Sequence, residues 1–351
     1  MRYLRSALIA ATVLSAPALA LADDAFSVVT SIKPLYSLTT ALTEGTPTKT
    51  TLLVKGAASP HTYSMAPSEA RALQEADVVF WIGPSLEHFL EKPLDALGGN
   101  ADVVELEDAP GVETLAPREG GAFDPHDHDH EGGEHADHEE EGHGDDAHHE
   151  AAHEDGDQDS DNGHDHGSDD HEAGHEHHGE IDPHMWLDPE NARAFANQMA
   201  ETLSKDDPEH AAIYAANAEK LNQRLDALQA DIAAELAAVT PKSYVVFHDA
   251  YHYFGHRFGV EAAGSITVNP EAPPSAQRVR EIHDKLIDLG AACVFSEPQF
   301  PPKIVDTVIE GTDARTGVLD PLGANLEDGP DLYFTLVENL AGNLIECFVA
   351  E

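Results

Sequence analysis

Histidine is concentrated in one segment of the chain, residues 124–180. This segment holds 15 of the 23 histidines and 23 of the 66 acidic residues, and it contains no Lys or Arg. Neutral imidazole is a common ligand of first-row metals such as zinc. The segment has almost no large apolar residue, so it cannot offset its chain entropy by burial, and we expect it to be disordered. The composition indicates a protein that handles a transition metal, with zinc as the first candidate; a solvated linker with incidental histidines is the alternative.

Three histidines outside this segment stand apart by position. We place His61, His184 and His248 at or beyond the carboxyl ends of expected strands, where open α/β sheets bind ligands. Asp320 follows the last expected strand in the same way. Taken singly, each histidine is more often a surface or hydrogen-bonding residue than a metal ligand. As a set, three imidazoles and one carboxylate suit the tetrahedral shell of Zn²⁺ better than Mn²⁺, which favours more oxygen ligands.

The elements that must position these residues alternate between strand and helix. Short β-branched runs predict strands at residues 26–31, 50–54, 78–82, 102–106, 244–247, 260–266, 292–295 and 317–319. Helical spacing between them predicts helices at residues 35–42, 68–76, 86–97, 251–258, 275–289, 304–310 and 332–348. This alternation predicts an α/β fold with mostly parallel sheets covered by helices.

The two alternating runs are separated by residues 190–239. Asp207 and Pro208 resemble a helix start, with Asp as the cap and Pro in the first helical position. No Gly or Pro follows before Val239, so the predicted helix would be roughly 45 Å long. We expect a stiff linking helix between two lobes, with two shorter helices meeting at a kink as the alternative.

These expectations divide the chain into successive parts. They are a signal peptide (1–22), an N-terminal α/β lobe (23–206) that includes the His-rich segment (124–180), a linking helix (207–239) and a C-terminal α/β lobe (240–351).

The N-terminus has the features of a secretory signal. Arg2 and Arg5 precede an apolar run too short to span a bilayer, and Ala20-Leu21-Ala22 fits a cleavage site. No Cys follows the run, so we expect Sec export without a lipid anchor and a soluble protein outside the cytoplasmic membrane. We expect no later stretch to be long and apolar enough to cross a membrane.

Charge and cysteine content narrow the function further. The formal net charge is −47, and residues 124–180 supply −23 of it. The acidic remainder argues against nucleic acid and anionic membrane surfaces as partners. The only cysteines, Cys293 and Cys347, predict a disulfide in an oxidising compartment, with two free buried thiols or a zinc site as alternatives.

Several residues near the three histidines are candidates for supporting roles. His252 and His256 follow His248 at helical spacing and line either the site or an exposed helix face. Asp182 and Asp188 are expected to brace the loop around His184 or to bond a ligand histidine. Trp186 is expected to pack, and to wall the site. The remaining histidines are expected to be solvated: His88, His210 and His283.

Four ordered motifs resemble a known family. They are G-A-A-S-P-H-T-Y-S-M-A-P-S (56–68), D-P-H-M-W-L-D-P-E-N (182–191), F-H-D-A-Y-H-Y-F (247–254) and L-D-P-L-G (319–323). They resemble the metal-binding solute proteins of ABC importers, of the periplasmic zinc-uptake (ZnuA) type. The resemblance covers nearly all of the chain after the signal, including the His-rich insertion.

The resemblance implies two α/β lobes, a rigid helix between them and Zn²⁺ held in the cleft. It places the ligands at His61, His184 and His248; manganese and iron members usually carry Glu at the last position. Asp320 or water would complete the site, because Pro60 stands where some zinc members carry Glu. It also implies a disulfide between Cys293 and Cys347.

The same resemblance implies a function without catalysis. The protein would be a monomer that captures zinc in the periplasm and delivers it to the membrane permease of an ABC importer with its cytoplasmic ATPase, with periplasmic zinc chaperones as further partners. The His-rich segment would collect or sense zinc. A periplasmic zinc store or buffer and a manganese or iron uptake protein remain alternatives. A zinc hydrolase is disfavoured because HExxH occurs only at residues 149–153 and 171–175, inside the segment expected to be disordered and not on an expected helix.

Overall fold

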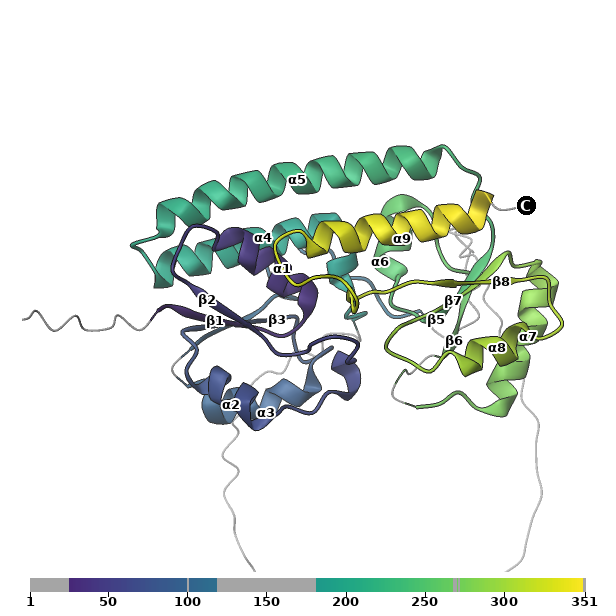
Figure 1. The fold of residues 1–351 in the computed structure, drawn as a ribbon, viewed down its shortest axis with the longest axis horizontal. Coiled ribbons are helices and arrows are strands. Elements are labelled where there is room, and N and C mark those ends of the chain that lie inside the picture. Colours follow the sequence, from purple (N-terminus) through teal and green to yellow (C-terminus); the bar gives the residue numbers. More distant parts are fainter. Residues whose placement is uncertain (1–24, 100, 119–180, 268–269, 271, 350–351) are drawn as a thin grey trace, which may run out of the picture. The chain divides into compact units, whose positions relative to one another are not determined.

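Two successive runs of alternating strands and helices form the fold (Figure 1). The computed structural model describes residues 25–99, 101–118, 181–267, 270 and 272–349. The expected signal peptide, residues 1–22, and the His-rich segment, residues 124–180, lie outside the described residues.

The first run forms a four-stranded parallel sheet in the order β2-β1-β3-β4. Its elements are β1 (Ser27–Thr30), α1 (Lys33–Leu42), β2 (Lys49–Leu52), the short 3-10 helix η1 (Pro60–Thr62), α2 (Pro67–Gln74), β3 (Val78–Trp81), α3 (His88–Leu97) and β4 (Asp102–Glu105).

The second run repeats this topology in the order β6-β5-β7-β8, again with all strands parallel. Its elements are β5 (Tyr244–His248), α6 (His252–Phe258), β6 (Gly264–Thr267), α7 (Ala276–Leu289), β7 (Cys293–Ser296), α8 (Lys303–Ile309), β8 (Arg315–Val318) and α9 (Leu332–Val349). The predicted α/β class with parallel sheets is confirmed.

Each sheet is apolar on both faces, as parallel sheets usually are. On β1, Val28 belongs to the core that includes α1 and α4, whereas Val29 belongs to the core that includes α2 and α3. On β5, Val246 belongs to the same core as α1 and α4, whereas Val245 belongs to a separate core that includes α7 and α8. The β-branched runs at residues 26–31 and 244–247 therefore form central strands.

Two long helices lie between the runs. The helix α4 (Pro189–Asp206) begins at Asp188, whose side chain accepts a hydrogen bond from the Glu190 amide. The helix α5 (Ala211–Ala237) begins four residues after the predicted cap, Asp207. Asp207 instead ends α4, and its carboxylate bonds His210 and Tyr214 at 2.8 and 2.6 Å. The predicted start of the linking helix was wrong because the same Asp-Pro pair also fits a turn between two helices.

The helix α5 contacts elements of both runs (Figure 1). Its buried side chains recur every three or four residues from Tyr214 to Leu236, and they share one apolar core with α1 and α9. Polar contacts between the runs add to this core: Lys33 pairs with Asp328 at 3.0 Å, and the Tyr333 amide donates to Ser37 Oγ at 3.0 Å. The two sheets are therefore joined by a packed layer of helices.

The apolar helix α9 requires a correction. Among the described residues, α9 is a helix that is long enough and apolar enough to cross a membrane, judged by length and composition. This contradicts the expectation that no stretch after the signal peptide would meet these criteria. Most of it is buried in the protein core, where Tyr333, Val337 and Leu344 are at most 1% exposed. A core helix of a soluble protein meets the same criteria, because burial on several faces also selects apolar residues.

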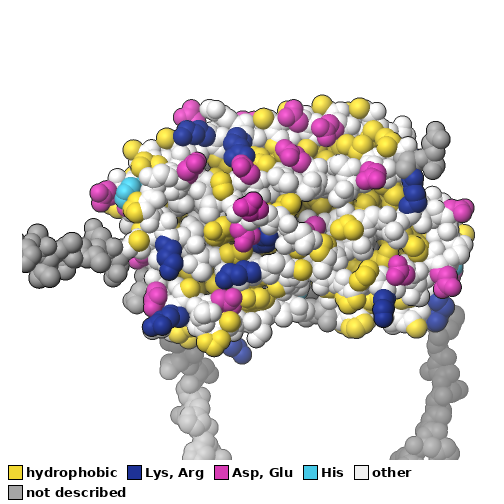
Figure 2. Space-filling view, in the orientation of Figure 1, with side chains coloured by type: hydrophobic (Ala, Val, Ile, Leu, Met, Phe, Trp, Pro, Cys, Tyr) yellow, Lys and Arg dark blue, Asp and Glu magenta, His cyan; other side chains and the backbone are white. Residues whose placement is uncertain are grey.

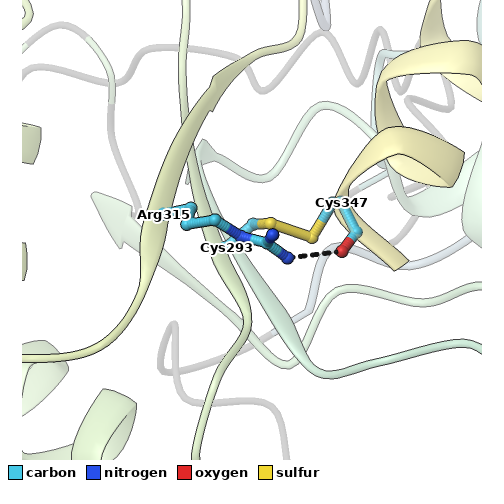
Figure 3. Close-up of a disulfide and its surroundings, with 3 residues drawn as sticks. All are labelled: Cys293, Arg315 and Cys347. Atoms are coloured by element: carbon cyan, nitrogen blue, oxygen red, sulfur yellow. Dashed lines mark hydrogen bonds between the residues drawn. A yellow bond between two sulfur atoms is a disulfide. The ribbon is translucent and has the colours of Figure 1, made fainter. Parts of the chain in front are cut away.

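The predicted disulfide is present in the structure. Cys293 at the start of β7 is bonded to Cys347 near the end of α9, with a Cα–Cα distance of 6.1 Å. Arg315 of β8 donates to the Cys347 carbonyl at 2.9 Å, beside the disulfide (Figure 3).

On the surface, acidic and basic side chains are interspersed over the face seen in Figure 2.

Candidate metal centre

Three histidines from distant parts of the chain converge on one point. Nε2 of His184 lies 3.2 Å from Nε2 of His61 and 3.2 Å from Nε2 of His248. The potential ligand atoms of all three lie within 4.8 Å of one another. No other group of three His, Cys, Asp or Glu side chains with metal-ligand spacing occurs among the described residues. We call this set the histidine triad.

The first member, His61, lies on η1 in the long connection after β2. Pro60 opens this 3-10 turn, and the fixed φ of proline suits the first helical position. The hydroxyl of Tyr63 contacts the Leu53 carbonyl at 3.1 Å and Glu69 at 2.8 Å, which ties the connection to the end of the strand and to α2. His61 remains half-buried, so it is the member nearest to solvent.

The second member, His184, is buried and is oriented by Asp182. One carboxylate oxygen of Asp182 lies 3.0 Å from the His184 amide nitrogen and 2.8 Å from its Nδ1. The backbone of Asp182 is itself fixed, because its amide donates to the Leu115 carbonyl and its carbonyl accepts from Tyr253. The expected bracing role of Asp182 is borne out by this geometry. His184 does not follow a described strand, however; it precedes the 3-10 helix η2 (Met185–Leu187) that leads into α4.

The third member, His248, is the last residue of β5 and is 4% exposed. Its Nδ1 lies 2.8 Å from both carboxylate oxygens of Glu297, and its amide donates to the same side chain at 3.2 Å. Glu297 is fully enclosed and was missed by the sequence analysis. It directly follows β7, so its place at the carboxyl end of a strand was the signal that could have identified it.

The carboxylates determine which nitrogen of each ring faces the triad. A carboxylate accepts and cannot donate, so Nδ1 of His184 and of His248 must carry hydrogen. When these rings are neutral, each Nε2 atom carries a lone pair and no hydrogen. The two Nε2 atoms then face each other as acceptors and cannot form a hydrogen bond. A cation between them would resolve this contact. Zn–N bonds of about 2.0–2.1 Å in a tetrahedral shell separate ligand nitrogens by about 3.3–3.4 Å, close to the 3.2 Å observed here.

The surroundings shift the pKa values of His61 and His248 in opposite directions. Burial lowers the pKa of His61 to about 2, with smaller contributions from His184 and His248, so this ring is neutral near pH 7. Burial also lowers the pKa of His248, but the charge of Glu297 and its hydrogen bond raise it above the ordinary value. In the metal-free protein, a proton on His248 Nε2 can therefore occupy the place of a cation.

Asp320 is not brought into the triad. It lies two residues after β8 and accepts hydrogen bonds from the amides of Leu322, Gly323 and Ala324 and from the Gln299 side chain. Both of its oxygens are therefore engaged away from a metal. The prediction that it completes the coordination shell has no support in this geometry.

The other candidates separate into site-wall and peripheral residues. The ring of Trp186 lies 5.3 Å from that of His184, and its Nε1 donates to the Pro321 carbonyl, so it walls the site as expected. His252 is 13% exposed and lies 3.5 Å from Asp182, whereas His256 is half exposed. Asp188 bonds Arg257 at 2.6 and 2.8 Å rather than a triad histidine. Among the histidines expected to be solvated, the side chains of His88, His283 and His210 are 66%, 30% and 21% exposed.

A cavity of about 210 Å³ adjoins the triad. It is lined by all three histidines and by Arg118, Asp249 and Ser265. Arg118 pairs with Asp249 and Glu261, so its charge is compensated beside the site. This side gives an ion the space to reach the Nε2 atoms.

The fold and sequence match known proteins over nearly their whole length. The family model "Zinc-uptake complex component A periplasmic", ZnuA, matches residues 28–347. The high-affinity zinc uptake system protein ZnuA of Brucella abortus (strain 2308) is 53% identical over 327 residues, 93% of each chain. The protein of that name from Yersinia pestis is 36% identical over 99% of this chain and 98% of its own.

A solved structure shows the same fold. The periplasmic zinc binding protein TroA from Treponema pallidum has a TM-score of 0.70 at 19% identity, covering 93% of this chain and 100% of that one. At this identity the likeness establishes the two-sheet architecture.

Proposed function

The chain belongs to the ZnuA family of periplasmic zinc-uptake components, and from this membership we propose that it captures Zn²⁺ and delivers it to an ABC importer. Its partners would be the membrane permease and, through it, the cytoplasmic ATPase. Residues 1–22 would direct Sec export and be removed after Ala22, leaving the mature protein in the periplasm.

The observation that carries this proposal is the contact between His184 and His248. Their Nε2 atoms lie 3.2 Å apart, and each ring is held from behind by a buried carboxylate. Carboxylates that bond the outer nitrogen of a ligand histidine fix its tautomer and increase its basicity. A site made in this way, with His61 as the third ligand, is prepared for a cation before the cation arrives.

The ligand chemistry favours zinc over manganese or iron. Three imidazole nitrogens form a compact set at tetrahedral spacing, whereas Mn²⁺ favours more oxygen ligands. Each carboxylate next to the triad, Asp182 and Glu297, has one oxygen bonded to a histidine Nδ1 atom. Manganese or iron uptake is thus the weaker alternative. Family membership favours a binding role over a hydrolytic one, although three histidines and a water also occur in zinc hydrolases.

The His-rich segment, residues 124–180, is assigned an auxiliary role in this proposal. Its imidazoles would gather zinc weakly, or sense its abundance. Its affinity should fade between roughly pH 7 and 5.5, where imidazoles of ordinary pKa become protonated. If the protein were instead a zinc store, most of the bound zinc would be held by this segment rather than by the triad.

The lobe boundaries are part of the same proposal. The N-terminal lobe (23–206) and the C-terminal lobe (240–351) would contribute His61 and His184 on one side and His248 on the other. The linking segment (207–239), which contains α5, would keep their separation nearly constant because the helix packs against α1 and α9.

A zinc titration of the mature protein with and without residues 124–180 tests this function. We expect one tight site and several weak ones in the full protein, and only the tight site after deletion. Loss of the tight site with retention of the weak ones would favour the zinc store and reject capture by the triad. A tight preference for Mn²⁺ over Zn²⁺ would reject zinc as the cargo.

A further inference from the structure

We propose that Gln299 holds a water molecule that completes the coordination of zinc at the histidine triad, and that Asp320 acts only by orienting Gln299. This inference rests on the proposed function and concerns the fourth ligand. In this arrangement the fourth ligand is a hydrogen-bonded water rather than the Asp320 carboxylate. Gln299 would bind the water, and Asp320 would orient Gln299.

Asp320 is held by the backbone that follows it. Its Oδ1 accepts from the amides of Leu322 and Gly323 at 3.1 and 3.0 Å, and its Oδ2 accepts from the Ala324 amide at 2.6 Å. To reach a metal, the carboxylate would have to abandon amides that would then be left without partners. Leaving such groups unsatisfied costs about 1–3 kcal/mol each when they are buried.

Asp320 also determines which end of the Gln299 amide faces the triad side. Its Oδ1 lies 2.9 Å from Gln299 Nε2, and a carboxylate can only accept. The amide nitrogen must therefore face Asp320. The other end, Oε1, is buried and accepts no hydrogen bond from any residue in the described part of the chain.

A small cavity adjoins both Gln299 and the triad. It has a volume of about 10 Å³ and is lined by Gln299 and Glu297 together with His61, His184 and His248. A volume of roughly 10–15 Å³ holds one water molecule. Glu297 Oε2 is a second buried acceptor on this lining, but it lies 2.8 Å from Nδ1 of His248, so we assign the water to Gln299 Oε1.

Zinc bound by three histidines has one position left in a tetrahedral shell. A water in that position uses a lone pair for the metal and keeps both hydrogens to donate. Donation to Gln299 Oε1 would satisfy the buried acceptor and orient the water. Gln299 is thus a positioning residue, and it contributes to zinc affinity through the water rather than through a bond to the metal.

A crystal structure of the zinc-loaded mature protein tests the placement directly. We expect a water oxygen bonded to zinc and within hydrogen-bonding distance of Gln299 Oε1, with Asp320 still on the 322–324 amides. A carboxylate oxygen of Asp320 or Glu297 in the zinc shell, or a shell without a water on Gln299, would overturn the proposal. Zinc on the three histidines in either case would leave the proposed function intact.

Competition titrations supply the second readout. Gln299→Leu removes the acceptor at nearly constant volume and should weaken zinc binding about tenfold, the effect of one hydrogen bond. Gln229→Leu on α5 is the matched control, because Gln229 also has a buried Oε1 without a partner among the described residues but does not line the site. Unchanged affinity in Gln299→Leu, or an equal loss in the control, would contradict the proposal; if the variant does not fold, the zinc-loaded structure decides.

Discussion

Nε2 of His184 and Nε2 of His248 face each other at 3.2 Å, although the residues are 64 positions apart in the sequence. Each ring presents its Nδ1 to a buried carboxylate, Asp182 for the first and Glu297 for the second. When both rings are neutral, this is a contact between two acceptors, which is unfavourable without a cation. The folded protein therefore favours binding of a cation between these two nitrogens.

Removing either carboxylate should weaken zinc binding without removing a ligand. We expect Asp182→Asn and Glu297→Gln each to reduce zinc affinity by about 10–100-fold, the usual effect of losing the partner of a ligand histidine. Competition titration with a chromophoric chelator measures this change.

Asp188→Asn is the control for these two variants. Asp188 is as buried as Asp182 and lies on the same loop, but its carboxylate bonds Arg257 and caps α4. We expect Asp188→Asn to lower stability and to leave zinc affinity within about twofold of the wild type, since it does not touch a ligand. Equal losses of affinity in all three variants would indicate a general loss of structure.

Zinc binding should release a proton near neutral pH. Glu297 raises the pKa of His248 above its ordinary value, and zinc needs the same Nε2 that the proton occupies. As pH falls through this raised pKa, the protonated fraction grows and zinc affinity should fall by up to about tenfold per pH unit. His61, with a pKa of about 2, adds no competition in this range.

Calorimetry in buffers of different ionisation enthalpy counts the released protons. Wild type should release more protons at pH 7 than Glu297→Gln, in which the pKa of His248 loses its main upward influence. Equal proton release in the two proteins would contradict this assignment of the titrating group.

Reduction of the disulfide should destabilise the protein and spare the site. The bond between Cys293 and Cys347 closes a loop of 54 residues, so its removal should cost about 4 kcal/mol of unfolding free energy in the chain-entropy model. Chemical denaturation of Cys293→Ser/Cys347→Ser against the oxidised protein measures this cost. Zinc affinity should stay within about threefold, because Cys293 begins β7 whereas His248 ends β5 and Glu297 follows β7, at the opposite, carboxyl ends of these parallel strands. A stability equal to that of wild type would contradict the prediction, as would two alkylatable thiols in the exported protein.

Sequence patterns predicted the fold and the strand-end positions of His61 and His248, whereas His184 was expected after a strand and instead precedes η2. Central parallel strands are buried on both faces, so their β-branched runs are legible without tertiary information. His61 and His248 follow strands, and the order of a βα repeat fixes which ends of the strands meet. The beginning of α5 could not be read in this way, because Asp207-Pro208 serves equally well in the turn after α4.

The partners of the triad depend on packing between distant segments. Glu297 contacts His248, which is 49 positions away in the sequence. The spacing of residues within either segment does not predict that contact. Asp320 has the position expected of a ligand, yet the Leu322–Ala324 backbone amides take its oxygens. Which acceptor faces a metal is determined by such competition, and a motif alone does not reveal it.

If His61, His184 and His248 form the tight zinc site, zinc affinity must collapse in His248→Ala. His256→Ala is the matched control, because His256 is also on the segment around α6 but is half exposed and contacts Glu113 and Glu261. In parallel competition titrations of the mature proteins, we expect His248→Ala to lose affinity by orders of magnitude and His256→Ala to bind as the wild type does. Unchanged tight binding in folded His248→Ala would contradict the account.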